Sequence, residues 1–474
     1  PAMVARLSDD SMRYLRSRLA ARYGKGHKRP IFQHITPELL KEYPVVLSTT
    51  FSSRSNFRAE TLFDYVIMDE ASQVSSETGA LALMCARNAV IVGDSMQLPN
   101  VITDADRLRM QAIAAKHAID PRYDCAALSF LESVCRVFPE APQTLLREHY
   151  RCHPKIINFC NQRFYGGRLL IMTEDHGEPD VITAWRTAPG HHARGAFNPR
   201  EIETIRREML PSLPCEPAEI GIISPYNEQV NALHRELGGG IDVATVHKFQ
   251  GREKEAIILS TVDDQITAFT DDPNLLNVAV SRAKRQFTLV TSSNEQPDSR
   301  NIADLLAYID YNGGKITESA IHSVFDLLYE PYAEARREFL KRHRRISEFD
   351  SENLTYALLE RVLEADPAFR HLGVLCHQPL RQLIRDWTIL DDEERRYALN
   401  GATHLDFLIY NRVSKRPVLA IETDGYQFHK QGTRQSERDR MKDRILDRYS
   451  LPLLRLSTTG TDEEAKIHTL LKRN

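Results

Sequence analysis

The sequence predicts an α/β fold with two parallel-sheet domains in tandem, followed by a smaller α+β domain. Short continuous apolar runs rich in β-branched residues each end at a polar site. Such runs are expected of parallel strands that helices cover on both faces. The runs fall into two sets separated by helical stretches, and from residue 351 onward the order becomes helix, three strands, helix, strand. That change of pattern predicts a separate C-terminal domain.

The first set of runs predicts a sheet within residues 45–145. It follows a polar, basic and helical stretch, residues 1–44, which we expect to be part of an insertion or a linker. The expected strands are PVVLSTT (44–50), YVIMDE (65–70) and NAVIVGD (88–94).

The second set of runs predicts a sheet within residues 146–295. Its expected strands are EIGIISPY (219–226), DVATVHKFQG (242–251), EAIILSTV (255–262) and QFTLVTSS (286–293). Residues 296–350 are predicted to be a helical connector. Its basic run, ARREFLKRHRR (335–345), is more typical of a solvated helix face than of a nucleic-acid track.

The third domain is expected at residues 351–474. Its predicted elements are the helix SENLTYALLERVLEA (351–365), the strands VLCHQPL (374–380), HLDFLIY (404–410) and PVLAIETDG (417–425), a charged helix (436–448) and the strand PLLRLS (452–457).

Composition narrows the class of protein. The chain has 474 residues and a formal net charge of -3, so nucleic-acid binding must come from local patches. Its seven cysteines show no CxxC pairing, which argues against a zinc site, a disulfide framework or an iron–sulfur cluster and suits a reducing compartment. No apolar run approaches the ~18 residues that a membrane span needs. We expect a cytoplasmic protein with no membrane partner.

Two adjacent carboxylates, Asp69 and Glu70, follow the apolar run YVIM. In-line phosphoryl transfer needs a metal ligand, a group that orients water and cations on the γ-phosphate. Asp69 fits the first role and Glu70 the second. One strand later, GDSMQLP (93–99) puts Asp94 and Gln97 at a carboxyl strand end, where ligands bind in open α/β sheets. The two strand ends together predict a site for ATP and Mg²⁺.

Four further stretches follow in order downstream. They are REHYRCHPKIINFCNQRFY (147–165), ISPYNEQV (223–230), TVHKFQGREKEAIILS (245–260) and NVAVSRAK (277–284). With the two strand ends they make residues 45–295 similar to superfamily 1 helicases, in the branch that includes the nonsense-mediated decay helicase. The resemblance implies two RecA-like domains that use ATP to move along a nucleic acid.

The resemblance implies a role for each matching position. Asp69 would bind magnesium and Glu70 would activate water. The residues that would contact the γ-phosphate are Gln97, Arg151 and Arg282. The residues that would bind or sense the rest of the nucleotide are Gln250, Gly251 and Glu253. The residues on the nucleic-acid side would be Thr245 and His247.

The glycine-rich phosphate cradle of such enzymes does not occur in the sequence. YGKGHKR (23–29) lacks a hydroxyl after the lysine, and NGGKIT (312–317) lies in the connector. The sequence also begins at Pro1 without an initiator Met. We therefore expect a fragment with an incomplete first RecA-like domain, whose Walker A region lies upstream in the same chain or in another chain. The chain as given should hydrolyse little ATP.

Three acids in the C-terminal domain predict a second metal site. Asp406 lies mid-strand between apolar neighbours, and Glu422 and Asp424 share one face of the next strand by alternation. A buried acid inside a strand is costly unless it is paired or metal-bound. Oxygen ligands that converge from a hairpin suit Mg²⁺, with Mn²⁺ as an alternative, and such an ion lowers the pKa of a bound water.

The order of elements and the stretch LAIETDGYQFH resemble PD-(D/E)XK nucleases, in the branch related to very-short-patch mismatch endonucleases. The resemblance implies that Asp406 and Glu422 are metal ligands. It also implies that Glu360, on the leading helix, completes the ligand set. His429 would orient or deprotonate the attacking water.

The sequence departs from the family's E-x-K pattern at one position. Asp424 stands where the family has lysine. Lys442, on the following helix, could supply the cation instead, or His429 could replace its role. The competing interpretation is an ordinary turn at Asp424 and an ordinary surface ion pair at Lys442.

The favoured hypothesis is an ATP-dependent DNA helicase joined to a magnesium-dependent endonuclease. Such a fusion suits DNA processing, repair or antiviral defence against foreign DNA. The expected partners are single-stranded DNA and duplex junctions; RNA stays open as the track, as do polarity and cleavage specificity. One alternative is a nucleic-acid-binding regulatory subunit that depends on another chain's phosphate cradle. Another is a translocase whose nuclease fold is catalytically dead.

Overall fold

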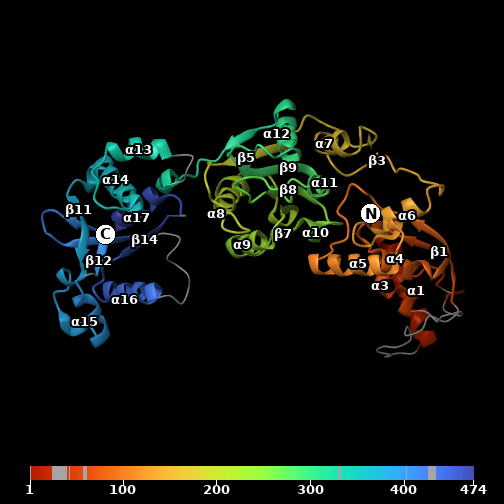
Figure 1. Cartoon of the computed structure of the whole chain (residues 1–474), viewed down its shortest axis with the longest axis horizontal. Helices are drawn as coiled ribbons and strands as arrows, with labels where there is room; N and C mark the ends of the chain where they lie inside the picture. The colour runs from red at the N-terminus through yellow and green to blue at the C-terminus, as the bar shows by residue number, and fades with distance from the viewer. Residues whose placement is uncertain are drawn as a thin grey trace. The chain divides into compact units, whose positions relative to one another are not determined.

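The computed structural model describes most of the chain and divides it into two compact units. The described residues are 2–23, 40–41, 43–56, 61–328, 333–401, 403–424, 434–458 and 460–473. The first unit is Pro1–Arg147 and the second is Glu148–Asn474 (Figure 1). The fold class is the expected one: α/β with parallel sheets, followed by a mixed C-terminal sheet. Among the described residues, no helix combines the length and apolar character that crossing a membrane requires.

The first unit is built on a two-stranded parallel sheet. β1 (Phe63–Met68) and β2 (Ala86–Ile91) pair so that Met68 lies opposite Ile91. The helices and helical turns of this unit are α1 (Ala2–Tyr23), α3 (Thr50–Ser53), η1 (Arg54–Asn56), η2 (Ala71–Gln73), α4 (Ser76–Leu83), α5 (Asp104–His117), η3 (Pro121–Tyr123) and α6 (Phe130–Val137). Its small core consists of Met68, Ala71, Ala82 and Phe130.

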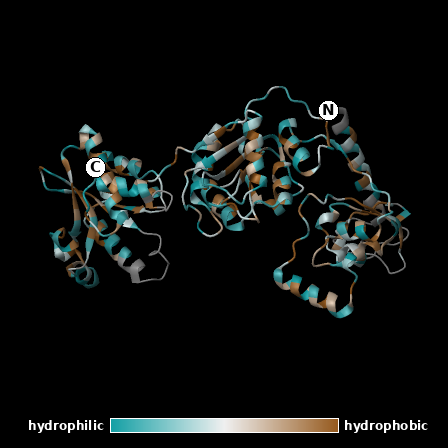
Figure 2. Ribbon diagram, turned by 45° about the horizontal axis from the view of Figure 1, so that its top comes forward, coloured by the Kyte–Doolittle hydropathy of each residue, from teal (hydrophilic) through white to brown (hydrophobic). Residues whose placement is uncertain are grey.

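Several large apolar side chains of this sheet are exposed. Ile67 is 71% exposed, Tyr65 is 64% exposed and Val90 is 45% exposed. Helix α5 carries hydrophobic and hydrophilic residues along its length (Figure 2), and none of its residues is buried. The described part of the first unit therefore holds too few elements to cover both faces of its strands.

The strand expected at residues 44–50 is absent from the described sheet. The run has no regular structure up to Thr49, and Val45 and Leu47 are 78% and 93% exposed. Thr49 instead caps α3, because its hydroxyl accepts a hydrogen bond from the Ser52 amide. β-branched residues form a strand only where a neighbouring backbone satisfies their polar groups. The prediction was wrong because no described strand pairs with this run.

The second unit contains a six-stranded, all-parallel sheet in the order β10-β5-β9-β8-β6-β7. Its strands are β5 (Ile182–Thr187), β6 (Ile220–Ser224), β7 (Asp242–Thr245), β8 (Lys254–Ser260), β9 (Ala283–Ser292) and β10 (Ile316–Glu318). The helices around it are α7 (Pro154–Phe164), α8 (Pro199–Thr204), α9 (Asn227–Leu237), α10 (Val246–Phe249), α11 (Pro273–Val280) and α12 (Asn301–Tyr311). A separate short pair consists of β3 (Glu148–His149) and β4 (Leu170–Ile171).

Both faces of the six-stranded sheet are covered. Ile222 and Ile258 pack against α8 and α9 on one face. Ile257 and Leu259 alternate with them, point to the other face and are each 1% exposed. Helices α11 and α12 pack against β8, β9 and β5 and supply the second layer. This is the double coverage that the apolar runs predict.

Two strands of this sheet were not predicted. β5 mixes polar and apolar residues, and β10 is only three residues long. β10 also lies within residues 296–350, so this stretch is not purely a helical connector. It contains α12, η7 (Val324–Leu328) and α13 (Ala333–Lys341) as well.

The C-terminal domain has the predicted order of helix, three strands, helix, strand. These elements are α14 (Asp350–Ala365), β11 (Leu372–Pro379), β12 (His404–Asn411), β13 (Pro417–Asp424), α16 (Arg434–Arg448) and β14 (Leu453–Ser457), with α15 (Asp392–Leu399) and α17 (Glu463–Arg473) in addition. β11, β12 and β13 are antiparallel neighbours, and β14 runs parallel to β13. Phe407 and Ile421 pack toward α14 and α17, whereas Leu408 and Ala420 pack toward α16.

Polar contacts join the C-terminal domain to the six-stranded sheet. Arg200 on α8 forms an ion pair with Asp326 on η7 at 3.0 Å, and their side chains are 3% and 11% exposed. The Thr461 hydroxyl, just before α17, donates a hydrogen bond to Glu203 on α8. Helix α8 therefore contacts both the connecting segment and the residue Thr461, which lies just before the last helix of the C-terminal domain.

Candidate active sites

The carboxyl end of β1 carries the first predicted residues. Asp69 and Glu70 follow the strand directly, and Glu70 adopts a left-handed backbone (φ 54°) at the start of η2. The Glu70 amide donates to Asp69 Oδ1 at 2.8 Å, and Gln73 Nε2 donates to Glu70 Oε2 at 3.1 Å. The sharp turn presents two adjacent carboxylates at the edge of the sheet.

The loop after β2 packs closely against this turn. A Cβ on Gly93 would lie 3.1 Å from the Ala71 amide nitrogen, so glycine permits the approach. Asp94 follows, and its Oδ2 accepts a hydrogen bond from Gln97 Nε2 at 3.0 Å. The loop that carries Gln97 and the turn that carries the two acids therefore share one sheet edge.

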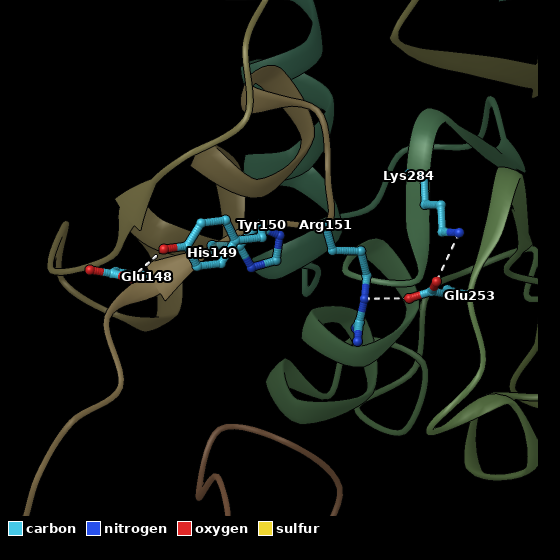
Figure 3. A pocket seen from close by; sticks show the side chains of 6 residues that line it. All are labelled: Glu148, His149, Tyr150, Arg151, Glu253 and Lys284. Carbon is cyan, nitrogen blue, oxygen red and sulfur yellow. Dashed lines mark hydrogen bonds and ion pairs between the residues drawn. The ribbon is translucent and has the colours of Figure 1, made fainter. Parts of the chain in front are cut away.

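A pocket of about 580 Å³ in the second unit gathers further predicted residues (Figure 3). It is lined by Glu148, His149, Tyr150, Arg151, Glu253 and Lys284. Arg151 Nε lies 2.7 Å from Glu253 Oε2, and Lys284 Nζ lies 2.8 Å from Glu253 Oε1. Lys284 and, after it, Arg151 hold the pKa of the Glu253 carboxyl below its ordinary value. Glu253 is therefore a charged anchor between two cations.

Arg282 lies buried close to this pocket. It is 4% exposed, its Nε donates to the Val278 carbonyl at 3.1 Å, and its terminal nitrogen donates to Ser281 Oγ at 3.1 Å. Burial, followed by the charges of Arg151 and Arg282, lowers the pKa of His149 to about 4. The structure thus brings both predicted arginines near one neutral imidazole.

The segment between β7 and β8 carries the remaining predicted residues of this half. Thr245 ends β7 and is 6% exposed, and His247 on α10 is exposed, with partial desolvation lowering its pKa. Gln250 ends α10, and Gly251 adopts a left-handed backbone (φ 78°) that glycine tolerates without strain. The chain then turns back to Glu253. One short segment therefore connects Thr245 to the pocket.

Four residues of the pocket were not singled out from the sequence. They are Glu148, His149, Tyr150 and Lys284. The exposed Tyr150 donates its hydroxyl hydrogen to Glu148. Lys284 closes the stretch NVAVSRAK, two residues after Arg282, and this position was its one available signal. Glu148, His149 and Tyr150 had no sequence signal beyond their place in the stretch REHYRCHP.

Asp406 and Glu422 lie side by side on adjacent strands. β12 and β13 pair with Phe407 opposite Ile421. Asp406 and Glu422 are the next residues on the two strands, just beyond this last ladder pair. The Asp406 amide donates to Glu422 Oε1 at 3.4 Å, and Asp406 Oδ2 accepts a hydrogen bond from the Thr423 amide at 2.8 Å. The structure therefore brings the two predicted metal ligands together.

Lys442 reaches this pair from α16. Its Nζ lies 2.6 Å from Glu422 Oε2 and 2.9 Å from the His404 carbonyl oxygen. The Lys442 and Glu422 side chains are 10% and 7% exposed. Burial raises the pKa of Glu422 to about 7 against the opposing charge of Lys442, and the charge of Asp406 adds to the rise. A helix thus supplies the cation that the strand lacks.

Asp424 stands two residues beyond Glu422 and contacts an arginine. Arg455 on β14 lies 3.2 Å from Asp424 Oδ1, and it is the ladder partner of Glu422. Arg455 was not predicted from the sequence, although an arginine inside the apolar run PLLRLS signals acidic partners nearby. His429 lies outside the described residues.

Glu360 is not placed with the acid pair. It lies one turn after Tyr356 on α14, whose ring stacks on Phe407. That contact is on the sheet face that α14 covers. Glu422 and Lys442 meet on the face that α16 covers. This corrects the expectation that Glu360 completes the ligand set, because its helix packs on the opposite face.

The acid pair has the chemistry to hold a divalent cation. Asp406 and Glu422 offer carboxylate oxygens from neighbouring strands, which are the ligands that a hard ion such as Mg²⁺ prefers. In the contacts described, these two carboxylates face one ammonium, that of Lys442. A divalent cation would more than offset the remaining negative charge.

Another cluster of metal-type donors lies in the second unit, at His153, Asp175 and Glu178. His153 Nδ1 accepts a hydrogen bond from the Lys155 amide at 3.1 Å, so Nε2 carries the proton that faces the two acids. Lys155 Nζ also lies 3.4 Å from Asp175. A protonated Nε2 cannot ligate a metal, so this cluster acts as a polar tether at the start of α7.

Three family models match the chain. Two of them, each described as an AAA domain, match residues 10–105 and 126–294. The third, described as a protein of unknown function (DUF2726), matches residues 349–473. The pocket around Arg151 thus falls in an AAA domain, and the acid pair falls in a family without an assigned function.

Relatives of the chain are helicases. It is 27% identical over 292 residues to an uncharacterised ATP-dependent helicase of Methanocaldococcus jannaschii, across 56% of this chain and 41% of that protein. It is 28% identical over 274 residues to the DNA replication ATP-dependent helicase/nuclease DNA2 of Gallus gallus, across 53% of this chain and 25% of that protein. A solved arterivirus nonstructural protein 10 helicase in complex with DNA aligns with a TM-score of 0.28 and 16% identity, across 53% of this chain and 45% of that chain.

The chain is therefore similar in sequence to ATP-dependent helicases, and two AAA-domain models match it. It spans less than half the length of these curated relatives.

Proposed function

We propose that this chain is part of an ATP-dependent superfamily 1 DNA helicase or translocase that carries a metal-dependent endonuclease. The observation that best supports the proposal is the buried cluster of Asp406, Glu422 and Lys442, in the same chain as the helicase-homologous sheets. Movement along a DNA strand would deliver DNA to this cluster. Such an enzyme suits DNA processing, repair or defence against foreign DNA. The proposed domains are 45–145 and 146–295 (RecA-like) and 351–474 (nuclease), with 1–44 and 296–350 as linking segments.

In the proposed ATPase, Asp69 holds Mg²⁺ and Glu70 orients the attacking water. The residues proposed to contact the γ-phosphate are Gln97, Arg151 and Arg282. Gln250, Gly251 and Glu253 serve the rest of the nucleotide, and Thr245 and His247 face the nucleic acid. A guanidinium on the transferring phosphate is worth ~10³–10⁵ in rate. The ion pair between Arg151 and Glu253 supports the assignment, because it keeps this guanidinium at the pocket.

The phosphate cradle must come from a segment with the pattern GxxxxGK[ST], in the same protein or in another chain, because the 474-residue sequence contains none. A DNA-stimulated ATPase assay tests this. We expect background hydrolysis by the purified chain. Turnover of about 1 s⁻¹ or more, as ordinary enzymes show, would contradict the proposal.

In the proposed nuclease, Asp406 and Glu422 are the residues that would hold Mg²⁺ or Mn²⁺. The bound ion would lower the pKa of a water and offset charge at the scissile phosphate. Lys442 donates to Glu422 and orients that carboxylate. Its ammonium also lies where it can stabilise negative charge that develops on the phosphate. The side chains are fixed by two strands and a helix, which are more precise supports than loops.

The test is cleavage of single-stranded and forked DNA with Mg²⁺ or Mn²⁺, by the parent and by Asp406→Ala. We expect the parent to cut and the variant to lose at least ~10²-fold in rate, as loss of a metal ligand predicts. Equal cleavage by both proteins, or none by the parent, would refute the nuclease assignment. The lysine position supports the second candidate, a translocase whose nuclease fold grips DNA without cutting it, since Asp424 stands there.

The third candidate is a nucleic-acid-binding regulatory subunit, which the missing phosphate cradle favours. Phosphate contacts should dominate its DNA affinity, with a slope of about -0.7 per neutralised phosphate against log salt for single strands. Nucleotide binding by the chain with and without an added cradle segment separates it from the ATPase. A subunit of this kind would bind DNA equally in both cases and would gain no turnover.

A further inference from the structure

We propose that Arg455 is a positioning residue that fixes helix α16 so that Lys442 points at Glu422. The inference rests on the proposed nuclease function. It also assigns a role to Asp424, the acid in the lysine position, as an anchor for this arginine.

Arg455 contacts acids from two other elements. One terminal nitrogen lies 3.2 Å from Asp424 Oδ1 on β13 and 3.7 Å from Asp439 Oδ1 on α16. The other lies 2.7 Å from Asp443 Oδ1 and 3.4 Å from the Asp439 carbonyl, both on α16. The guanidinium of a strand residue thus holds a neighbouring strand and a helix at once.

The two acids on α16 flank the lysine. Asp439 and Asp443 are four residues apart and so lie on one face of the helix, one turn apart. Lys442 belongs to that same turn. Arg455 therefore fixes the rotation and height of the turn from which Lys442 extends. Because Arg455 is also the ladder partner of Glu422, the arginine contacts and the lysine contact connect the same strand and helix.

The chemistry of arginine suits this role. Its planar guanidinium can bind two carboxylates in a fixed geometry, which a single ammonium cannot. The Arg455 side chain is 24% exposed. Burial lowers its pKa, but the hydrogen bond that Arg455 donates to Asp443 and the charges of the three acids outweigh this and raise it. The group stays charged, and removing it would leave clustered acids beside the acid pair.

The same contacts account for the departure from E-x-K. A lysine at position 424 would place an ammonium beside the Arg455 guanidinium, and the like charges would repel. An acid there attracts Arg455 instead. The cation that the chemistry needs is then supplied from α16 as Lys442. Asp424 and Lys442 are therefore two parts of one arrangement in this domain.

The test compares Arg455→Gln and Arg455→Lys with a matched control, Arg444→Gln. Arg444 is an exposed arginine of α16 that contacts Met441 Sδ at 3.3 Å. In single-turnover cleavage of forked DNA with Mn²⁺, we expect Arg455→Gln to lose about 10–100-fold in rate at saturating DNA, as loss of an outer-shell partner predicts, with the half-saturating DNA concentration unchanged. Arg455→Lys keeps the positive charge but loses the planar guanidinium, so its cleavage rate should lie between those of the parent and of Arg455→Gln. The control should stay within about twofold of the parent.

A second readout does not depend on cleavage. Lys442 is 8% exposed, so its amine should react slowly with an acetylating reagent, as measured by mass spectrometry. In Arg455→Gln we expect about tenfold faster acetylation of Lys442, the lower end of the outer-shell range, with no change in Arg444→Gln. Asp443→Asn should also accelerate acetylation of Lys442, to a smaller extent. Combined with Arg455→Gln it should add little, because both changes break the same contact between Arg455 and Asp443.

The outcomes separate the inference from the function on which it rests. If folded Arg455→Gln and Arg455→Lys proteins protect Lys442 as well as the parent does, the positioning role is refuted. If Lys442 becomes reactive but neither the parent nor Asp406→Ala cuts DNA, the positioning role stands and the nuclease assignment fails.

Discussion

Two of the parallel sheets among the described residues are built from similar sequences with opposite exposure. Ile67 in β1 is 71% exposed, whereas Ile257 in β8 is 1% exposed. Both strands are continuous apolar runs, YVIM and AIIL, which predict coverage on both faces. Six strands and flanking helices provide that coverage in the second unit, and the described part of the first unit does not. The comparison shows that an apolar run indicates a strand whose two faces should be covered. The surrounding elements decide whether that coverage is present.

The largest test of this contrast is a pair of core truncations. Phe287→Ala in β9 removes a fully buried ring and should cost about 3–5 kcal/mol of unfolding free energy. Ile67→Ala should change it by no more than about 0.5 kcal/mol, because the side chain is already exposed. Hydrogen–deuterium exchange measures each sheet separately. Similar costs in both sheets would remove the contrast.

A pH series tests the second sheet by itself. Glu201 is fully buried, and its carboxylate accepts hydrogen bonds from Ser260 Oγ at 2.5 Å and the Val262 amide at 3.0 Å. Burial raises its pKa from 4.5 to about 8 against these hydrogen bonds. The folded state thus binds this proton more tightly than the unfolded state, so the stability it contributes is full below pH 4.5 and is lost as pH rises through 8.

Between pH 5 and pH 7 this loss should reach about 2–3 kcal/mol, at about 1.4 kcal/mol per pH unit. Glu201→Gln cannot titrate and serves as the control. Its exchange protection in β8 should vary less with pH than that of the parent. A parent protein with equal protection at both pH values would contradict the assignment.

Adding the missing elements of the first sheet should increase the effect of Ile67→Ala on the free energy of unfolding. If a strand–GxxxxGK[ST]–helix segment packs on β1, Ile67 becomes buried. Ile67→Ala should then cost about 1.5–3 kcal/mol, the value of burying one such side chain. The measurement is exchange protection of β1 and β2 with and without the added segment. Unchanged protection would show that this segment does not cover the sheet.

The smallest expected effect concerns the acidic edge of the first sheet. Gly93→Ala places a methyl group 3.1 Å from the Ala71 and Ser72 amide nitrogens, and this crowding should cost about 1 kcal/mol. Met96→Ala, at an exposed position of the same loop, should cost less than half as much. Thermal unfolding of the two variants decides the point. Equal melting temperatures would mean that this loop does not pack as tightly as its backbone contacts suggest.

Most strands of the fold were predictable from local apolar runs, and the exceptions share a physical cause. β5 and β10 are held by pairing with strands distant in sequence, and neither has an apolar run of its own. The run at 44–50 is the opposite case: it has β-branched residues, but no described strand pairs with it. The local amino-acid sequence predicts the preference of a segment for a strand, whereas strand pairing depends on segments distant in sequence.

The candidate sites follow the same division. Asp406 and Glu422 were predictable because alternation and a single hairpin determine which residues face each other. Glu360 was misplaced because the face on which a helix packs depends on the tertiary arrangement. Arg455 was missed because its acid partners come from another strand and from α16. Contacts set by packing between separate elements were therefore the least predictable.

The buried pair of Arg200 and Asp326 has a mechanical consequence. Separating such a pair leaves an uncompensated charge and costs ~3–5 kcal/mol. Together with the hydrogen bond from Thr461 to Glu203, this ion pair connects α8 to the connecting segment and to the residue just before the final helix. A rotation of the six-stranded sheet would then carry the acid pair with it as a lever arm. The acid pair would be displaced by an amount that grows with its distance from the axis.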